Sequence, residues 1–344
     1  MNLWILIGSF IISFIFSLFS TKLIIPYFKR NNIVALDLQK KGTPMVANSG
    51  GIPVFFGLFM GLMFFIGSEV FLFDSSTDLV YLFGSILTIF LITLIGFFDD
   101  LNSKDVIEGK AKIRKGLKQW QKPLLTLPAA IPLMAIKAGY TTMWFPLIGN
   151  VDFGLLYPLV LVPIGIVGAA NAVNLLGGFN GSEAGMGIVY CTTLGVYSLI
   201  LGRTTPAVIF LSCSGALLGF LKYNWFPAKI LSGDSIQYLL GSVVATGVII
   251  GNIEKAGLIL MIPFFIELLL KIRGKIETGK FGVRCMGILR KDGKLDPPFG
   301  KKIYSWTHLI MNIKPMTEKQ VTMMLILMQV VFSIIFWFVV NLVI

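Results

Sequence analysis

Long apolar segments recur along the whole chain and are separated by short polar or basic stretches. Each approaches the roughly 20 residues that a helix needs to cross the hydrocarbon core of a bilayer. The segments lie at about 3–27, 52–72, 79–98, 123–139, 155–174, 184–201, 206–221, 235–251, 255–271 and 320–343. We therefore predict an all-α, polytopic membrane protein with about ten transmembrane helices.

Some of the predicted helices are short for a bilayer and carry glycine or proline, so their boundaries are expected to shift: 123–139, 184–201, 206–221 and 255–271. The composition, 56% hydrophobic and only 13% charged, supports the membrane class and argues against a soluble protein. No internal repeat is visible. We treat 1–344 as a single transmembrane domain with a large polar loop at about 272–319.

Basic residues are sorted between the two faces of the predicted membrane protein. Alternate loops and their flanks, beginning at Lys22, hold 26 of the 29 Lys and Arg residues, and the other face holds only Lys137, Arg203 and Lys255. Because basic residues concentrate on the cytoplasmic side, we expect both termini outside the cell. The net charge of +12 then faces anionic headgroups and anionic substrate, and no nucleic-acid-binding module is visible.

The sequence lacks the features of several common targeting segments, metal sites and nucleotide-binding sites. The segment 3–27 has no positive leader or cleavage site, so we interpret it as a retained helix. Cys191, Cys213 and Cys285 lack the spacing of a zinc site, and no disulfide is implied. The sequence has no Walker-type phosphate loop, dinucleotide-binding GxGxxG or HExxH motif. The lone histidine, His308, is more typical of a structural than of a catalytic residue.

Polar residues gather where the segment 155–174 reaches the basic face. The stretch Asn171-Ala-Val-Asn-Leu-Leu-Gly-Gly-Phe-Asn-Gly-Ser-Glu-Ala-Gly185 includes Asn174, Asn180 and Glu183. A buried amide without a partner costs about 1–3 kcal/mol, so something polar must meet these side chains. The four glycines of the stretch are expected to let the backbone approach a ligand closely. We interpret the stretch as the floor of a site for a diphosphate and its metal.

Carboxylates lie on the same face at two other segments. Asp99 and Asp100 end the segment 79–98, where they oppose the helix macrodipole unless a cation compensates. Asp234 precedes the segment 235–251. Two plainer alternatives remain, namely solvated loop residues for the pair and an amino-terminal helix cap for Asp234. Their arrival on one membrane face together with the asparagines favours a shared functional site.

Basic residues of this face are candidates for binding phosphate. Lys122 opens the segment 123–139 and is the lysine best placed to reach a substrate phosphate. Lys40 and its neighbours in the first basic loop most simply contact lipid headgroups. In the loop 272–319, which is long enough to cover a site, Arg284 is the single charge in an apolar run.

Oxygen donors of this kind suit a hard cation. Mg²⁺ prefers a few protein oxygens together with substrate phosphate and water, and Mn²⁺ is an alternative. The candidate oxygen donors are Asp99, Asp100, Asn174 and Asp234. Basic residues nearby would hold the rest of an anionic, diphosphate-bearing substrate.

Three motifs, in this order, resemble the polyprenyl-phosphate N-acetylhexosamine-1-phosphate transferase family: Gly96-Phe-Phe-Asp-Asp100, the stretch from Asn171 to Gly185, and Tyr223-Asn-Trp-Phe-Pro-Ala-Lys-Ile-Leu-Ser-Gly-Asp234. Within the family the chain is most similar to the archaeal and eukaryotic dolichyl-phosphate N-acetylglucosamine-1-phosphate transferase branch. The similarity runs from the first predicted helix to the last. The basic and histidine-rich motif of the family's last cytoplasmic loop is thin here, with Arg284 as its best match. The acidic residue that the eukaryotic branch carries before its second helix is not evident.

The resemblance implies ten helices, a cytoplasmic site and an enzyme that uses Mg²⁺. The reaction implied transfers N-acetylglucosamine 1-phosphate from UDP-N-acetylglucosamine to a dolichyl-type polyprenyl phosphate, releases UMP and begins lipid-linked glycan assembly for protein N-glycosylation. The residues carried over are Asn174 and Asp234 for Mg²⁺, Asp99 and Asp100 for the lipid phosphate, Lys122 for phosphate, and Asn180 near the uridine. Asn171, Glu183 and Arg284 are further substrate-binding candidates.

The expected partners are the UDP-sugar donor, the polyprenyl phosphate acceptor and the bilayer, with no nucleic acid and with a homodimer as an open alternative. The expected location is the plasma membrane of a prokaryote, archaeal in preference to bacterial. Two other functions stay open. One is a bacterial-type transferase that uses undecaprenyl phosphate. The other is a lipid-linked sugar transporter, a class that tends to show repeated halves and midplane polar groups.

Overall fold

A computed structural model describes residues 3–73, 78–108, 111–118, 120–145, 148–279 and 283–343 of the chain. Helices dominate this part of the chain. Seven of them are long and apolar enough to cross a membrane: α1 (Leu3–Arg30), α2 (Gly51–Phe73), α3 (Leu79–Asn102), α7 (Ser182–Ile200), α8 (Thr204–Asn224), α9 (Gly233–Gly251) and α13 (Glu318–Val343). The predicted all-α, polytopic membrane class is confirmed.

The other three predicted spans are interrupted or short. The segment 123–139 forms α4 (Gln121–Thr126), a 3₁₀ turn η1 (Leu127–Ala130) and α5 (Ile131–Ala135). The segment 155–174 forms a π-helical turn η2 (Tyr157–Leu161) that runs into α6 (Val162–Asn174), and 255–271 forms α10 (Glu254–Leu260) and α11 (Ile262–Thr278). Each broken segment contains proline, which removes a helix donor. The count of ten membrane-spanning helices is therefore not established by this structure.

Short antiparallel strands and one further helix, α12 (Trp306–Ile313), lie outside the predicted spans. The sequence analysis did not predict these strands. They pair as β1 (Val34–Leu36) with β2 (Met45–Ala47), β3 (Lys104–Glu108) with β4 (Ala111–Lys115), β5 (Thr142–Phe145) with β6 (Gly149–Asp152), and β8 (Lys294–Asp296) with both β7 (Ile288–Leu289) and β9 (Met316–Thr317).

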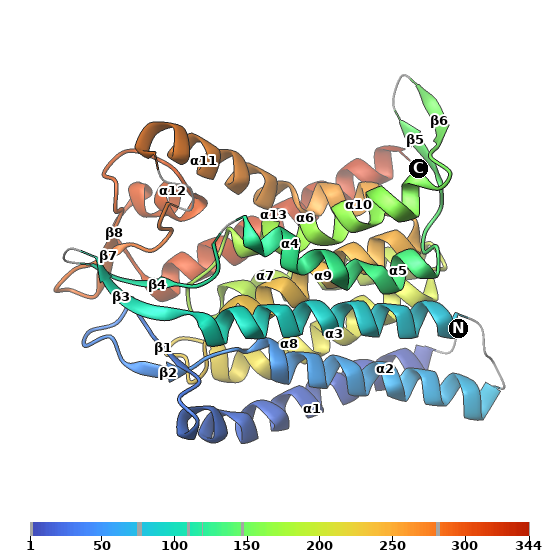
Figure 1. Ribbon diagram of the computed structural model, residues 1–344, viewed down its shortest axis with the longest axis horizontal. Helices are drawn as coiled ribbons and strands as arrows, with labels where there is room; N and C mark the ends of the chain where they lie inside the picture. The colour runs from blue at the N-terminus through green and yellow to red at the C-terminus, as the bar shows by residue number, and fades with distance from the viewer. Residues whose placement is uncertain are drawn as a thin grey trace.

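The helices form a bundle whose two ends differ. Figure 1 shows β1 to β4, β7, β8 and α12 at one end, and the β5–β6 hairpin with both chain termini at the other. Within the bundle α1 packs on α2 and α8, α3 and α6 pack on α9, and α7 packs on α8 and α13. The loops that the sequence analysis placed on the basic face therefore lie at one end, opposite the termini.

A stripe of small polar residues holds α1 inside the bundle. Ser9, Ser13 and Ser17 recur at intervals of four and are fully buried. They lie against glycines of α2 and α8. A β-carbon on Gly61 of α2 would lie 2.6 Å from the Ser9 carbonyl oxygen, and one on Gly219 of α8 would lie 2.4 Å from the Phe14 carbonyl oxygen. Small residues let membrane helices approach closely and gain van der Waals contact. The opposite face of α1 carries large exposed apolar side chains suited to lipid.

The break between α10 and α11 is supported from a third helix. Gln329 on α13 is fully buried, and its Nε2 donates to the Leu260 carbonyl at 3.1 Å. A carbonyl freed at a helix break in a membrane needs such a partner, because no water is available. The polar side chain in α13 therefore has a structural cause.

We expect Gly219→Ala to lower the unfolding temperature of the purified protein in detergent. The added methyl group has no room against α1, and overpacking of this kind typically costs about 1–3 kcal/mol. Gly168→Ala is the matched control, because a β-carbon there meets nothing within 4 Å. Equal unfolding temperatures for the two variants would contradict the close packing of α1 on α8.

Candidate active site

A lysine between two carboxylates forms the centre of the site. The Lys122 Nζ lies 2.8 Å from an oxygen of Asp99, at the end of α3, and 2.8 Å from an oxygen of Asp234, in the first turn of α9. The side chain of Asp99 is fully buried, that of Lys122 is 10% exposed and that of Asp234 is 24% exposed. The second Asp99 oxygen accepts from the backbone N–H of Leu117 at 2.9 Å. Asp234 is therefore the member of this cluster that is most open to a ligand.

Asp100 holds the amino terminus of α9. One of its carboxylate oxygens accepts from the Asp234 N–H at 2.9 Å and the other from the Ser235 N–H at 3.2 Å. Gly233 makes this approach feasible, since a β-carbon there would lie 2.3 Å from the Asp100 carboxylate. Asp100 supplies the bonds of a helix cap from a different helix. The alternative that Asp234 caps α9 is therefore wrong, and the carry-over of Asp100 to the lipid phosphate stays untested.

The asparagines at the end of α6 lie beside this cluster. The Asn171 amide nitrogen donates to the Val167 carbonyl at 2.8 Å and contacts the Thr126 hydroxyl at 3.4 Å, so Asn171 ties α6 to α4. Asn174 neighbours Tyr238, whose ring lies 5.8 Å from the Lys122 ammonium. The Asn174 amide nitrogen is buried and has no hydrogen-bond partner among the described residues. Its amide hydrogens face Tyr238 and are available to an acceptor such as a phosphate oxygen, whereas a cation would be held by the amide oxygen.

Asn180 joins three segments. Its Oδ1 accepts from the Lys40 ammonium and from the Ala228 N–H at 3.1 Å, and its own N–H donates to Glu318 at 2.9 Å. Lys40 also pairs with Glu318 and Asp37, at 2.7 Å each. The headgroup contact predicted for Lys40 is therefore wrong, because its side chain is only 14% exposed. A partly buried lysine of this kind could not be told from the loop's other basic residues in the sequence.

Glu183 is buried and engaged with the protein. One of its oxygens accepts from the Gly178 N–H at 2.8 Å and from Gln237 at 3.1 Å, and the other accepts from Ser182 at 2.7 Å and from Ser232 at 3.3 Å. Glu183 thus fastens the loop after α6 to α9. Its predicted contact with substrate stays a prediction.

The glycines of the Asn171 to Gly185 stretch make room for protein groups. A β-carbon on Gly177 would lie 2.4 Å from Glu183, one on Gly178 would lie 2.7 Å from Met286, and one on Gly181 would lie 2.8 Å from the Trp225 ring. Side chains of the protein therefore occupy the space beside these three glycines, and the expected approach of the backbone to a ligand stays a prediction.

A polar cavity of about 180 Å³ opens beside the cluster. Its walls come from the first basic loop, the loop after α6, the start of α9 and Met286 of the loop 272–319. The polar lining comes from three carboxylates and five neutral side chains: Asp37, Glu183, Asp234, Asn48, Asn180, Asn224, Ser232 and Gln237. Three of the sequence-predicted residues, Asn180, Glu183 and Asp234, therefore line one cavity.

Arg284 lies in the part of the loop 272–319 that covers the site. Its neighbour Cys285 contacts the Leu175 carbonyl at 3.5 Å, and Met286 lines the polar cavity. The Arg284 Nε is buried without a hydrogen-bond partner among the described residues, and burial lowers the pKa of this guanidinium. Arg284 therefore keeps hydrogen-bonding capacity for an anion.

His308 is structural in this fold, as the sequence analysis favoured. Its Nδ1 accepts from the Tyr304 N–H at 3.2 Å, which leaves Nε2 as the donor to the Arg284 carbonyl at 2.8 Å. Burial, opposed in part by that hydrogen bond, lowers the pKa of His308 to about 4. The ring is fully buried and neutral, so it does not act as an acid or base at neutral pH.

The oxygen donors of the site have the chemistry of a partial Mg²⁺ site. Asp234 offers carboxylate oxygens to the polar cavity. Asn174, beside Tyr238, has an amide oxygen, and Mg²⁺ takes both kinds of ligand. The described residues, those of the site included, contain no group of three or more His, Cys, Asp or Glu that could hold a metal by themselves. The residues fit a cation that is shared with phosphate oxygens, and they do not form a complete protein cage.

Comparison with known proteins indicates the family of this chain. Residues 82–252 match the model of glycosyl transferase family 4. A Sulfolobus acidocaldarius protein is 28% identical over 95% of this chain and 93% of its own length, and a Saccharolobus solfataricus protein is 30% identical over 94% of each. Both are named, provisionally, as UDP-N-acetylglucosamine–dolichyl-phosphate N-acetylglucosaminephosphotransferases. A Clostridium perfringens phospho-N-acetylmuramoyl-pentapeptide-transferase is 30% identical over 71% of this chain and 73% of its own.

We expect Lys122→Met to destabilise the protein strongly in thermal unfolding. The change leaves two carboxylates facing each other, and removing one partner of a buried ion pair costs about 3–5 kcal/mol. The double variant Asp99→Asn/Lys122→Met should recover part of the loss, because one unpaired charge is then gone. Lys118→Met, at an exposed lysine just before α4, is the control. A Lys122→Met variant as stable as that control would show that the ion pairs contribute nothing.

We also expect His308 to make stability fall in acid. Its pKa in the folded protein, about 4, lies below its ordinary value of 6.5, so the unfolded chain binds the proton first as the pH falls. Stability contributed by neutral His308 is present above pH 6.5 and declines toward pH 4, by at most about 1.4 kcal/mol per pH unit. Unfolding measured at pH 7.5, 6 and 5 should therefore show a steeper loss for the wild type than for His308→Gln. An equal loss of stability with falling pH in the wild type and in His308→Gln would contradict this role of His308.

Proposed function

This chain belongs to glycosyl transferase family 4, and on that basis we propose that it transfers N-acetylglucosamine 1-phosphate from UDP-N-acetylglucosamine to a dolichyl-type polyprenyl phosphate. The products are lipid-diphospho-N-acetylglucosamine, which begins lipid-linked glycan assembly, and UMP. The observation that carries the proposal is the similarity over 94–95% of the chain to two archaeal proteins named for this reaction. The bacterial pentapeptide transferase matches only 71% of it.

The donor nucleotide is assigned to the polar cavity. Asn180 and Asp234 both line this cavity, and Asp234 pairs with Lys122. A uridine at Asn180 with its diphosphate at Asp234 would therefore place the phosphates beside the Lys122 cluster. Arg284 then supplies a second positive charge from the covering loop. Hydrogen bonds to charged groups of this kind contribute about 1.5–3 kcal/mol each.

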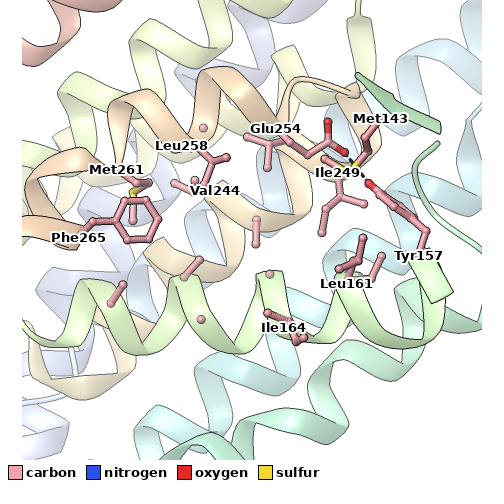
Figure 2. A pocket seen from close by; sticks show the side chains of 18 of the residues that line it. Met143, Tyr157, Leu161, Ile164, Val244, Ile249, Glu254, Leu258, Met261 and Phe265 are labelled. Atoms are coloured by element: carbon pink, nitrogen blue, oxygen red, sulfur yellow. Dashed lines mark hydrogen bonds between the residues drawn. The ribbon is translucent and has the colours of Figure 1, made fainter. Parts of the chain in front are cut away.

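The acceptor chain is assigned to a second, apolar cavity. This cavity of about 450 Å³ lies between α6, α9, α10 and the start of α11. Figure 2 shows Tyr157 and Glu254 joined by a hydrogen bond at one end, and Met261 and Phe265 at the other. Its wall on α6 reaches Ala172, two residues before Asn174. A prenyl chain in this cavity would therefore lead to the polar cluster.

In the proposed reaction an oxygen of the lipid phosphate attacks the sugar-side phosphorus of the donor. A new phosphorus–oxygen bond forms, and the bond to UMP breaks with its electron pair leaving on the UMP oxygen. Lys122 neutralises charge on the phosphates, and Asp99 fixes the position of its ammonium. Such a transfer needs chiefly placement and charge neutralisation from the protein.

Asn174 and Asp234 are the residues that would hold Mg²⁺, with Mn²⁺ as an alternative. The bound cation would neutralise charge on the donor diphosphate. We further propose that the site faces the cytoplasm of a prokaryotic plasma membrane. The sorting of Lys and Arg between the two faces supports this orientation. The basic loops lie at the end of the bundle that carries the site.

The direct test is an assay with protein purified in detergent. UMP release from UDP-N-acetylglucosamine should require an added polyprenyl phosphate, and mass analysis should find a lipid-diphospho-N-acetylhexosamine. UDP-N-acetylmuramoyl-pentapeptide and undecaprenyl phosphate serve as competing substrates. A product that carries peptide would establish the bacterial-type alternative, and no product with any donor would leave transport as the function to examine.

In the same assay, Asp234→Asn should lower kcat by at least about 100-fold, because a carboxylate that binds a catalytic cation contributes several kcal/mol. The residual activity should need more Mg²⁺ than the wild type does. Asp152→Asn, an exposed aspartate in the hairpin at the opposite end, is the matched control. Turnover and Mg²⁺ dependence like the wild type in Asp234→Asn would refute this role.

A further inference from the structure

We propose that Lys271, Thr307 and His308 are positioning residues for Arg284, and that together they set the affinity of the site for the diphosphate of the donor. The proposal rests on the proposed function, in which Arg284 binds that diphosphate. None of the three side chains touches the cavity, and each acts through the main chain of Arg284 or of its neighbours.

Three successive carbonyl groups around Arg284 are each held by a side chain. The Lys271 ammonium donates to the Val283 carbonyl at 2.5 Å, His308 donates to the Arg284 carbonyl at 2.8 Å, and the Thr307 hydroxyl donates to the Cys285 carbonyl at 2.6 Å. The peptide units on both sides of Arg284 therefore cannot rotate without breaking a buried hydrogen bond. This fixes the direction in which its side chain leaves the backbone.

The groups that hold these carbonyls are themselves buried and braced. Lys271 is 2% exposed and lies 3.3 Å from Glu267, one turn earlier on α11. The other Glu267 oxygen accepts from the Trp306 N–H at 2.9 Å, at the start of α12. A buried lysine and glutamate are costly unless fully paired. Here they connect α11, α12 and the segment 283–285 into one rigid support.

The support also sets the distance of the loop from the site. Lys271 lies 2.7 Å from the Cys285 sulfur, and that sulfur contacts the Leu175 carbonyl, next to Asn174. The segment 283–286 is thereby held against the end of α6. Because the Arg284 Nε is buried and unpaired among the described residues, its placement has no other fixed partner in this part of the chain.

This arrangement also accounts for the lone histidine and for a charged pair within an apolar helix. Neither His308 nor the Glu267–Lys271 pair reaches the polar cavity. A loop that carries a binding arginine but lacks regular structure needs fixed anchors, since ordering a flexible loop on binding reduces affinity. The three side chains provide that order before the donor arrives.

The test compares donor and acceptor kinetics in Thr307→Val and Lys271→Met with those in the wild type and Arg284→Ala. Thr307→Ser keeps the hydroxyl and is the conservative control, and Lys302→Met removes an exposed lysine of the same loop. We expect KM for UDP-N-acetylglucosamine to rise roughly tenfold in the two test variants, as for a weakened contact to a charged group. The kcat and the KM for polyprenyl phosphate should stay within about twofold, and both controls should match the wild type.

A double-variant cycle decides whether Thr307 acts through Arg284. If it does, Thr307→Val/Arg284→Ala should be no weaker for the donor than Arg284→Ala alone. Additive losses, or an unchanged donor KM in Thr307→Val, would overturn the inference while the proposed function stands. Thr307→Val is nearly isosteric, so it keeps the test available if Lys271→Met does not fold. A wild type without turnover of any UDP-sugar would instead overturn the proposed function.

Discussion

The site depends on how two adjacent carboxylates at the end of α3 are neutralised. At the carboxyl end of a helix, negative charges oppose the helix dipole and need compensation. Each carboxylate is compensated by a different group. Lys122 pairs with Asp99, and backbone N–H groups at the amino terminus of α9 donate to Asp100. The favourable end of one helix dipole thus meets the unfavourable end of another. Both interactions act on α9, so the position of Asp234 follows from them.

Close backbone contact is the second constraint on α9. A β-carbon on Gly51, at the start of α2, would lie 2.4 Å from the Ser235 carbonyl carbon, and one on Gly96 of α3 would lie 2.7 Å from the Ser235 α-carbon. The Gly51 N–H also donates to the Ser235 hydroxyl at 3.1 Å. Three helices thus meet at the first turn of α9 with no side chain between them. Such contacts leave little freedom to the residue that they surround.

Much of this arrangement could be predicted from the sequence, because hydrophobic length and charge sorting are local properties. These properties predicted the membrane class. They also predicted that four polar residues lie at the same end of the helix bundle: Asp99, Lys122, Asn180 and Asp234. Partners far apart in the chain could not be predicted in this way. Asp99 and Asp100 are adjacent and look equivalent in the sequence. In the structure Asp100 accepts from the backbone of α9, whereas Asp99 pairs with Lys122. The short strands were missed because runs of two to five residues carry little periodic signal.

Helix α9 lines both cavities, and this explains why the polar cluster lies where it does. On α9, Asp234 and Gln237 line the polar cavity, whereas Val244, Ala245 and Val248 line the apolar one. Ten residues of helix separate Asp234 from Val244, a rise of roughly 15 Å. On α6, the apolar lining ends at Ala172 and the polar site begins at Asn174. A reaction that joins a water-soluble donor to a membrane-bound phosphate needs its charges at such a boundary, and Lys122 is the cation that the fold fixes there.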